Sequence, residues 1–400
     1  MRLSRRPRVI LFTAWLVAVA WLTLQPGNAA GPLSVDDFFC LGCSGRWGAD
    51  AILNLVLFLP GGFLLVGLVG ARSTILVALA LTVGIETLQI TLAGRHPSLE
   101  DILTNTLGAA AGAVVASWPA GRLRAVAAMV AVAAWLAPAL LLAPAPRDAD
   151  LYALRNPDFP GSPVYPGRVL DARIDDVVLR GKLADSDPVR ASIRERAALH
   201  LEFVVAPEPA RPTSLFGLYD GDQKENLRVA VRGDDVFVSW WSRATRFGLD
   251  QPEQVARGAL AGTAAGDTVV LGMLHEGRRW CLDGPHGRDC DMSPGQSSGW
   301  ALLLYPEGAS RFAALAYSGL WAVLAGVLLG LALGGWRTAA AGGAALAAVG
   351  LGAAALAPEL LPDARAALLL VTGAALGGVA GALLWPSHAC SAGVNRRILR

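Results

Sequence analysis

Residues 51–70 read AILNLVLFLPGGFLLVGLVG and contain no charged side chain. A helix rises about 1.5 Å per residue, so roughly 20 largely apolar residues are needed to cross the hydrocarbon core of a bilayer. This stretch therefore predicts a transmembrane helix. Further outward along the chain, similar apolar runs recur on both sides of a more polar central region.

The composition also indicates a membrane protein. Hydrophobic residues make up 54% of the chain and charged residues only 16%, whereas soluble proteins have about 25% charged residues. Apolar residues concentrate in 9–143 and 311–385, and most charges lie in 145–308. This split predicts two membrane blocks around one water-exposed domain. A net charge of +2 without a long basic run argues against nucleic acid as a partner.

Eight stretches approach the length of a span, which predicts a polytopic α-helical membrane protein with about eight transmembrane helices. The first and fourth stretches are the weakest predictions, and the fourth contains Thr104, Asn105 and Thr106. The eight stretches are residues 9–25, 51–70, 74–93, 102–118, 125–143, 312–334, 339–357 and 364–385.

The distribution of arginines predicts the orientation, because short cytoplasmic loops carry an excess of positive charge. Arg5, Arg6 and Arg8 place the N-terminus inside, and the arginines of the tail place the C-terminus inside. We therefore expect a multi-pass protein of the inner (cytoplasmic) membrane with an extracytoplasmic central region. The first stretch could instead be a cleaved secretory signal. However, residues 28–30 read NAA, and Asn28 stands where signal cleavage favours a small residue. A retained helix is the preferred prediction.

Four of the five cysteines fall outside on this topology, and disulfides persist in oxidising compartments. Cys281 and Cys290 are predicted to form a disulfide that closes a hairpin. Cys40 and Cys43 could form a small disulfide, a redox pair or half of a metal site, and we favour a structural role. No second CxxC motif completes a zinc site, so the sequence predicts neither a metal centre nor a cofactor.

Polar side chains cluster near the outer ends of the second, third and fourth stretches. Ionisable groups inside a span are costly and are therefore functional candidates. Glu86 and Gln89 lie one helical turn apart on one face, and short loops make the three helices neighbours. The cluster either ties the helices together or forms a pocket for a polar headgroup or glycan. The six candidate ligand-binding residues are Asn54, Glu86, Gln89, Arg95, Asp101 and Asn105.

In the pocket interpretation, Arg95 binds phosphate or carboxylate, and Glu86 or Asp101 accepts a proton. No serine triad, P-loop or zinc-protease motif accompanies these residues. The catalytic residues, and whether the protein is an enzyme, therefore stay undecided.

The spacing of these polar and small residues resembles the VanZ-like membrane family over residues 1–143. The resemblance implies a cell-envelope role and a possible link to glycopeptide antibiotic resistance, but it implies no reaction. The pattern is Asn54-x3-Phe58-x-Pro60-x-Gly62, then Glu86-x2-Gln89, then Arg95-x2-Ser98-x2-Asp101-x3-Asn105-x2-Gly108-x3-Gly112.

The central region changes to short runs bounded by Gly, Asp and Pro, which predict an antiparallel sandwich. The segments 214–222 and 226–233 resemble a concanavalin A-like (laminin-G-like) jelly roll, a fold often used to bind glycans. Trp241 is a candidate for stacking on a sugar, with core packing as the alternative. Asp220, Asp222 and Asp235 could ligate calcium, although acidic turn residues are usually solvated. The expected strands are 199–205, 214–219, 227–231, 236–241, 268–274, 279–282 and 301–305.

The sequence thus predicts a membrane domain at 1–143, an extracytoplasmic β domain at 144–308, a three-helix membrane block at 309–387 and a cytoplasmic tail at 388–400. The partners expected are membrane lipids and an envelope glycan or lipid-linked precursor. The favoured function is binding of such a glycan or a surface polysaccharide at the outer face. The alternative is a membrane enzyme that uses Glu86 or Asp101 on an envelope lipid or glycan. A transporter is disfavoured because no inverted repeat is evident.

Overall fold

The computed structural model describes residues 4–26, 38–42, 44–157, 164–207, 212–276, 279–290, 296–304, 311–333, 336–356 and 364–384. Two compact units divide the described residues. One unit draws on Met1–Ala133, Ala322–Ala347 and Leu368–Arg400, and the other on Ala134–Trp321 and Ala348–Ala367.

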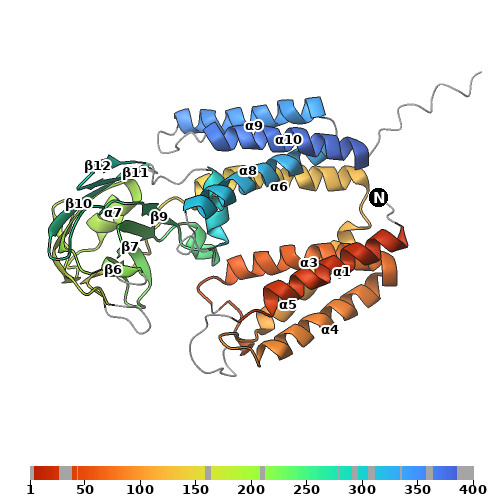
Figure 1. Cartoon of the computed structure of the whole chain (residues 1–400), viewed down its shortest axis with the longest axis horizontal. Coiled ribbons are helices and arrows are strands. Elements are labelled where there is room, and N and C mark those ends of the chain that lie inside the picture. The colour runs from red at the N-terminus through yellow and green to blue at the C-terminus, as the bar shows by residue number, and fades with distance from the viewer. Residues whose placement is uncertain are drawn as a thin grey trace, which may run out of the picture. The chain divides into compact units, whose positions relative to one another are not determined.

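Long helices form the N-terminal and C-terminal parts of the chain (Figure 1). Five helices of the described residues are long and apolar enough to cross a membrane: Arg5–Thr23, Trp47–Val69, Ala71–Gln89, Ala120–Pro138 and Ala313–Leu333. The predicted count of eight spans is therefore not confirmed. The helices are α1 (Arg5–Thr23), α3 (Trp47–Val69), α4 (Ala71–Gln89), α5 (Leu99–Val115), α6 (Ala120–Leu141), α8 (Arg311–Leu333), α9 (Trp336–Leu356) and α10 (Ala364–Leu384).

The fourth predicted span forms α5, which has 17 residues and so falls just short of the usual spanning length. Its first turn carries Glu100 and Asp101. These acidic residues favour the positive end of the helix dipole, where the Ser98 side chain also accepts a hydrogen bond from Glu100 N. The start of α5 is thus specified by capping chemistry, and the polar first turn shortens its apolar part.

Glycines allow α3 and α5 to pack backbone against backbone. A Cβ atom on Gly62 would lie 1.9 Å from the carbonyl oxygen of Ala109, and one on Gly112 would lie 2.0 Å from that of Leu59. Only hydrogen fits at these positions, so the small residues set the distance between the helices. In the C-terminal block, a Cβ on Gly326 of α8 would lie 2.2 Å from the carbonyl oxygen of Leu370 in α10.

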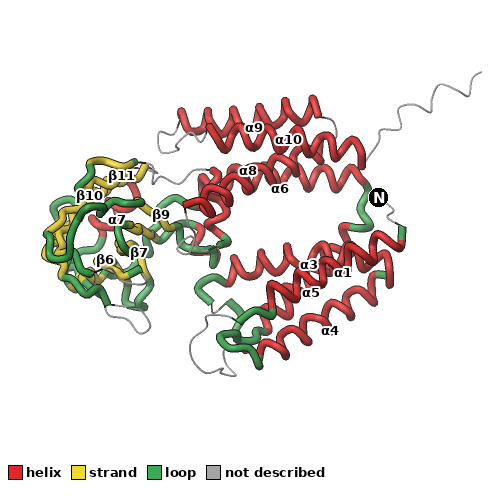
Figure 2. Tube along the Cα trace, in the orientation of Figure 1, coloured by secondary structure: helices red, strands yellow, loops and turns green. Residues whose placement is uncertain are grey.

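The central region is a sandwich of two antiparallel six-stranded sheets, drawn as strands in Figure 2. The first has the order β4-β1-β6-β7-β8-β9, with bounds Gly181–Lys182, Tyr152–Arg155, Thr213–Tyr219, Glu225–Arg232, Asp235–Trp240 and Glu253–Ala256. The second has the order β12-β11-β10-β5-β2-β3, with bounds Gly287–Asp289, Arg279–Gly284, Thr268–Glu276, Arg196–Val204, Arg168–Ile174 and Val177–Val178.

Alternating apolar residues from both sheets fill the space between them, as the pattern predicted. Trp240 of β8 and Trp280 of β11 stack at the centre, with ring centroids 4.4 Å apart. The second sheet also carries the disulfide between Cys281 and Cys290. Cys43 lies outside the described residues, so the predicted Cys40–Cys43 pairing falls there too. The short helix α7 (Asp187–Glu195) precedes β5.

One predicted strand is wrong. Residues 301–304 do not extend a sheet, because Gln296–Leu302 form the 3-10 helix η2. The Trp300 carbonyl accepts hydrogen bonds from Leu303 N and Leu304 N at 3.0 Å, which closes the backbone on itself. Ser297, Ser298 and Gly299 precede it, and such residues favour turns over strands.

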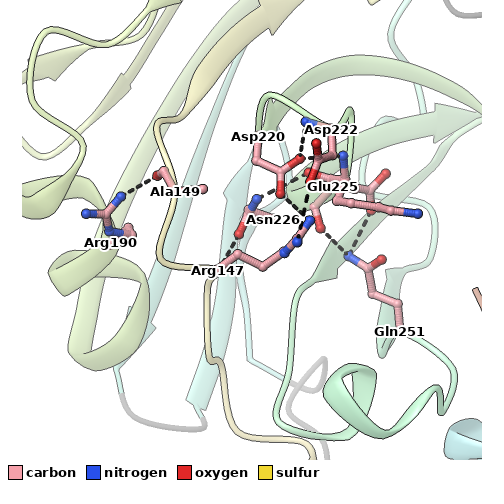
Figure 3. Close-up of polar contacts among 9 residues, drawn as sticks. Arg147, Ala149, Arg190, Asp220, Asp222, Glu225, Asn226 and Gln251 are labelled. Carbon is pink, nitrogen blue, oxygen red and sulfur yellow. Dashed lines mark hydrogen bonds and ion pairs between the residues drawn. The ribbon is translucent and has the colours of Figure 1, made fainter.

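The chain that leaves α6 is bonded directly to the β sandwich, without a free linker. Leu142 accepts a hydrogen bond from Trp240 Nε1 at 3.0 Å, and Ala145 N donates to the Trp241 carbonyl at 2.8 Å. Arg147 then pairs with Asp220, and its backbone N–H donates to Asn226 Oδ1 at 2.7 Å (Figure 3). The first residues after α6 are therefore part of the domain.

We expect an Asp220→Ala variant to lose about 3 kcal/mol of stability, because it removes the buried partner of Arg147 and leaves that guanidinium only the exposed Asp222 at 3.7 Å. The same carboxylate accepts backbone hydrogen bonds from Asp222 N at 3.0 Å and Lys224 N at 2.8 Å. Thermal unfolding of the full chain followed by circular dichroism measures the change. An Asp222→Ala control, whose side chain is 76% exposed, should differ from wild type by less than about 0.5 kcal/mol. Equal effects of the two variants would contradict the assignment.

Candidate functional site

Asn54 of α3 and Asp101 of α5 are joined by a direct hydrogen bond. Asn54 Nδ2 donates to Asp101 Oδ1 at 2.7 Å and to Thr104 Oγ1 at 3.3 Å. The close packing of α3 on α5 brings these groups together. The structure thus unites two of the six candidates that are 47 residues apart in the sequence.

Glu86 of α4 is buried, with 3% of its surface exposed. Its Oε2 atom accepts a hydrogen bond from the backbone N–H of Ser98 at 2.9 Å, just before the first turn of α5. Glu86 therefore links the end of α4 to the beginning of α5. Glu86 thus has a structural role in addition to its predicted role in ligand binding.

Glu86 and Asp101 both lie at the beginning of α5, because Glu86 bonds to Ser98 N and Asp101 belongs to the first turn that follows. Within the part of the chain that the structure describes, neither forms an ion pair, and each carboxylate accepts a single hydrogen bond. An ionised carboxylate offers about four lone-pair sites. Both side chains therefore keep acceptor capacity beyond what helix packing uses.

Asn105 of α5 is also buried, at 3% exposure. Its Nδ2 atom donates to Thr82 Oγ1 of α4 at 2.9 Å, while its Oδ1 atom has no hydrogen-bond partner among the described residues. An unpaired buried acceptor costs about 1–3 kcal/mol. Asn105 is thus a buried acceptor that the protein alone does not satisfy.

Gln89 and Arg95 bond to the end of α1. Gln89 Nε2 donates to the Thr23 carbonyl at 3.0 Å, and Arg95 donates from Nε to the Gln25 carbonyl at 2.9 Å and from Nη2 to the Leu22 carbonyl at 3.3 Å. The Leu22 and Thr23 carbonyls are among those that a helix leaves unpaired at its C-terminus, where a cation is also favourable. Arg95 has five N–H donors, so three remain for an anion.

Sequence reasoning missed one partner of the candidates and two contacts that hold the surrounding helices and loop. Thr82 lies one turn before Glu86 on α4 and pairs with Asn105, so helical spacing could have found it. Glu100 accepts a hydrogen bond from Gly42 N at 2.9 Å, and no sequence pattern signals this contact. Trp15 Nε1 of α1 donates to the Leu57 carbonyl at 2.7 Å and completes the packing of α1 on α3.

All six candidates lie between the first helix and the beginning of α6. Residues 8–120 match the family model described as VanZ/LLP1. The predicted VanZ-like resemblance is thereby confirmed for this region, which we call the VanZ-like region. No curated protein and no solved structure matches the chain. The VanZ-like region and the apolar helices indicate a membrane protein, whose helices contact lipid.

The central domain lies outside the VanZ-like region. Its two sheets agree with an all-β sandwich and only loosely with a concanavalin A-like domain. Trp241, the proposed sugar-stacking residue, is half-buried, and the Arg147 guanidinium carbon lies 5.3 Å from its ring centroid. A sugar would therefore have to use the other side of the ring or displace Arg147.

The acidic turn residues of the calcium alternative have protein partners. Asp220 pairs with Arg147, and Asp235 pairs with Arg257 at 2.7 Å. Asp235 also accepts a hydrogen bond from Gly258 N at 2.9 Å. These carboxylates are already used in ion pairs and backbone contacts.

A polar group also covers the face of the first sheet that points away from the core. Glu225 Oε1 accepts a hydrogen bond from Ser239 Oγ at 2.6 Å. It also accepts one from Gln251 Nε2 at 3.1 Å (Figure 3). Arg228 pairs with Glu225 at 3.3 Å. Burial, with a smaller contribution from the charge of Glu225, raises the pKa of the Tyr219 phenol, which keeps it neutral. This group satisfies itself, so the VanZ-like region remains the better candidate.

Proposed function

We propose that the chain is an inner-membrane protein of the bacterial cell envelope that binds the polar part of a lipid-linked glycan or surface polysaccharide at its outer face. The arginine distribution supports cytoplasmic termini and an extracytoplasmic β domain. The VanZ/LLP1 match over residues 8–120 supports an association with glycopeptide antibiotic resistance.

The observation that carries this proposal is unused hydrogen-bonding capacity within apolar helices. Glu86 and Asp101 each accept one hydrogen bond and form no ion pair in the described residues, and Asn105 Oδ1 accepts none. Glycan hydroxyls are hydrogen-bond donors, so these oxygens complement them. The three remaining donors of Arg95 complement the phosphate that joins a glycan to its lipid.

The structure allows a substitution that changes charge and preserves packing. Glu86→Gln keeps a side-chain oxygen for Ser98 N, and Asp101→Asn keeps one for Asn54 Nδ2. We expect either substitution to weaken binding of an isoprenoid-linked glycan about tenfold, because a charge-assisted hydrogen bond becomes a neutral one. Thermal stability should stay near that of wild type.

The test is binding of the detergent-purified full chain to a panel of envelope lipids and glycans, measured by microscale thermophoresis. Glu195→Gln, an exposed residue of α7, is the matched control and should bind as wild type does. Arg95→Ala should selectively weaken ligands that carry phosphate. Absence of binding to every member of the panel, with folded protein, would overturn the proposal.

The alternative function is acid–base catalysis on such a ligand, and the position of two carboxylates without ion pairs at the beginning of α5 favours it. Single-turnover assays with a bound lipid-linked glycan separate the two functions. Catalysis predicts a product with wild type and a loss of turnover of at least about 100-fold in Glu86→Gln or Asp101→Asn. A ligand recovered unchanged from wild type would leave binding as the function.

A further inference from the structure

The loop that follows β8 is fixed to the chain that leaves α6. Arg243 N donates to the Ala143 carbonyl at 3.1 Å, and Pro144 forms an isolated bridge with Ser242. The loop continues directly into the 3-10 helix η1 (Ala244–Phe247). Its position is therefore set by the end of α6.

The end of α6 defines the level of the membrane surface. Residues Ala120–Pro138 form a candidate span, and the helix continues to Leu141. The residues from Pro138 to Leu141 add a rise of about 4.5 Å, and Ala143, which accepts the bond from Arg243, follows two residues later. The headgroup layer is about 5–8 Å thick on each side of the hydrocarbon core. The loop thus lies at the depth of lipid headgroups.

The side chains of this loop have the chemistry that such a surface requires. Phe247 is 59% exposed, and Arg243 and Arg246 are exposed. Neither arginine forms an ion pair or side-chain hydrogen bond within the residues described. Two unpaired cations beside an exposed aromatic ring match anionic headgroups with acyl chains below them.

A second attachment of the sandwich to a candidate span involves aromatic residues. Trp300 of η2 donates from Nε1 to Ser318 Oγ of α8 at 2.9 Å, and its ring lies 5.2 Å from that of Tyr317. Asp250 N, soon after η1, donates to the Leu302 carbonyl at 2.9 Å. Tryptophan and tyrosine are enriched at membrane interfaces, so this attachment agrees with the depth assigned to η1.

We propose that residues 243–247 form an interfacial anchor in which Arg243 and Arg246 bind the phosphates of anionic phospholipids and Phe247 enters the boundary of the acyl chains. The anchor adds a lipid contact to the two covalent connections of the β sandwich. It is independent of the glycan-binding proposal and requires only that α6 spans the membrane.

The depth of Phe247 provides the first test. The experiment uses the full chain with Phe247→Cys, and this cysteine is labelled with a polarity-sensitive fluorophore. Cys40, Cys43 and Cys390 are changed to serine, and the Cys281–Cys290 disulfide is retained. In nanodiscs with roughly one-third phosphatidylglycerol, in keeping with an anionic surface, we expect blue-shifted emission and quenching by spin-labelled lipid. The matched control is Val270→Cys on β10, 49% exposed, which should emit as in water.

The charge dependence provides the second test. Each arginine is expected to favour the anionic surface about fivefold. The double variant Arg243→Gln with Arg246→Gln should therefore lower the apparent affinity for phosphatidylglycerol, measured by the quenching, about 25-fold. Arg180→Gln, also exposed, should have no effect.

Water-like emission from position 247 would overturn the anchor. Quenching that is unchanged without phosphatidylglycerol and in the double variant would overturn the headgroup assignment. Loss of quenching when a soluble protein partner is added would show that a protein, and not lipid, covers the loop.

Discussion

A Gly112→Val variant is expected to lose the packing of α3 on α5 and to be recovered mostly as aggregate. The Cβ atom of any larger residue would lie 2.0 Å from the Leu59 carbonyl oxygen and 2.7 Å from Phe63 N. Both are backbone atoms, so the clash cannot be relieved by a side-chain rotation and the helices must separate. We expect a cost of at least about 3 kcal/mol, the upper end for overpacking.

Size-exclusion chromatography after heating in detergent measures this effect, with an expected drop of about 10 °C or more in the temperature at which the monodisperse peak is lost. Gly84→Ala on α4 is the control, because a Cβ there meets no atom within 4 Å. Alanine should be neutral or slightly stabilising at that helical position. If Gly112→Val retains the wild-type profile, the close approach of α3 and α5 is incorrect.

Separation of α3 and α5 also has a functional consequence. Asn54 and Asp101 come from these two helices, and Glu86 bonds to the residue that caps α5. The close approach set by glycine therefore positions the proposed binding groups. A milder Gly108→Ala variant, whose Cβ would lie 2.7 Å from the Leu55 carbonyl oxygen, should lower glycan affinity before it prevents folding.

The second large effect is expected in the β sandwich. Trp240→Ala should destabilise the domain by about 3–5 kcal/mol, the usual range for a fully buried aromatic residue. Trp240 is 0% exposed and stacks on Trp280 at 4.4 Å. Its removal leaves a cavity between the sheets and deprives the buried Leu142 carbonyl of a hydrogen bond of 3.0 Å.

The neighbouring Trp241 is a matched control, because it has the same side chain on the opposite face of the same chain segment. It is half-buried, and its ring contacts Arg147, so Trp241→Ala should lose only about 1 kcal/mol. Limited proteolysis of the full chain, followed at residues 145–304, compares the two variants. Similar protease resistance of Trp240→Ala and wild type would refute the core assignment.

Sequence patterns predicted the β sandwich only in part. Period-two alternation located β5, β6, β7, β8, β10 and β11, because one face of each strand must be buried, but it did not assign β1, β2, β3, β4, β9 or β12. It failed at residues 301–304, where Trp300 is buried in a 3-10 helix, since apolar content alone does not distinguish a strand from other buried backbone. The strand pairing itself depends on distant segments, such as β1 beside β6.

The sequence by itself determined that the chain has apolar helices, a VanZ-like region with polar side chains at fixed spacing, and an all-β central region. The apolar helices and the β region follow from local composition and periodicity, which the solvent imposes on each segment separately, whereas the VanZ-like region is a resemblance that the family match confirmed. Only the tertiary structure decided that Asn54 bonds to Asp101, that Gln89 and Arg95 cap α1, and that Asn105 keeps an unpaired oxygen. Partners of this kind depend on how closely the helices approach one another, and that distance is set by packing around Gly62 and Gly112, which no single segment specifies.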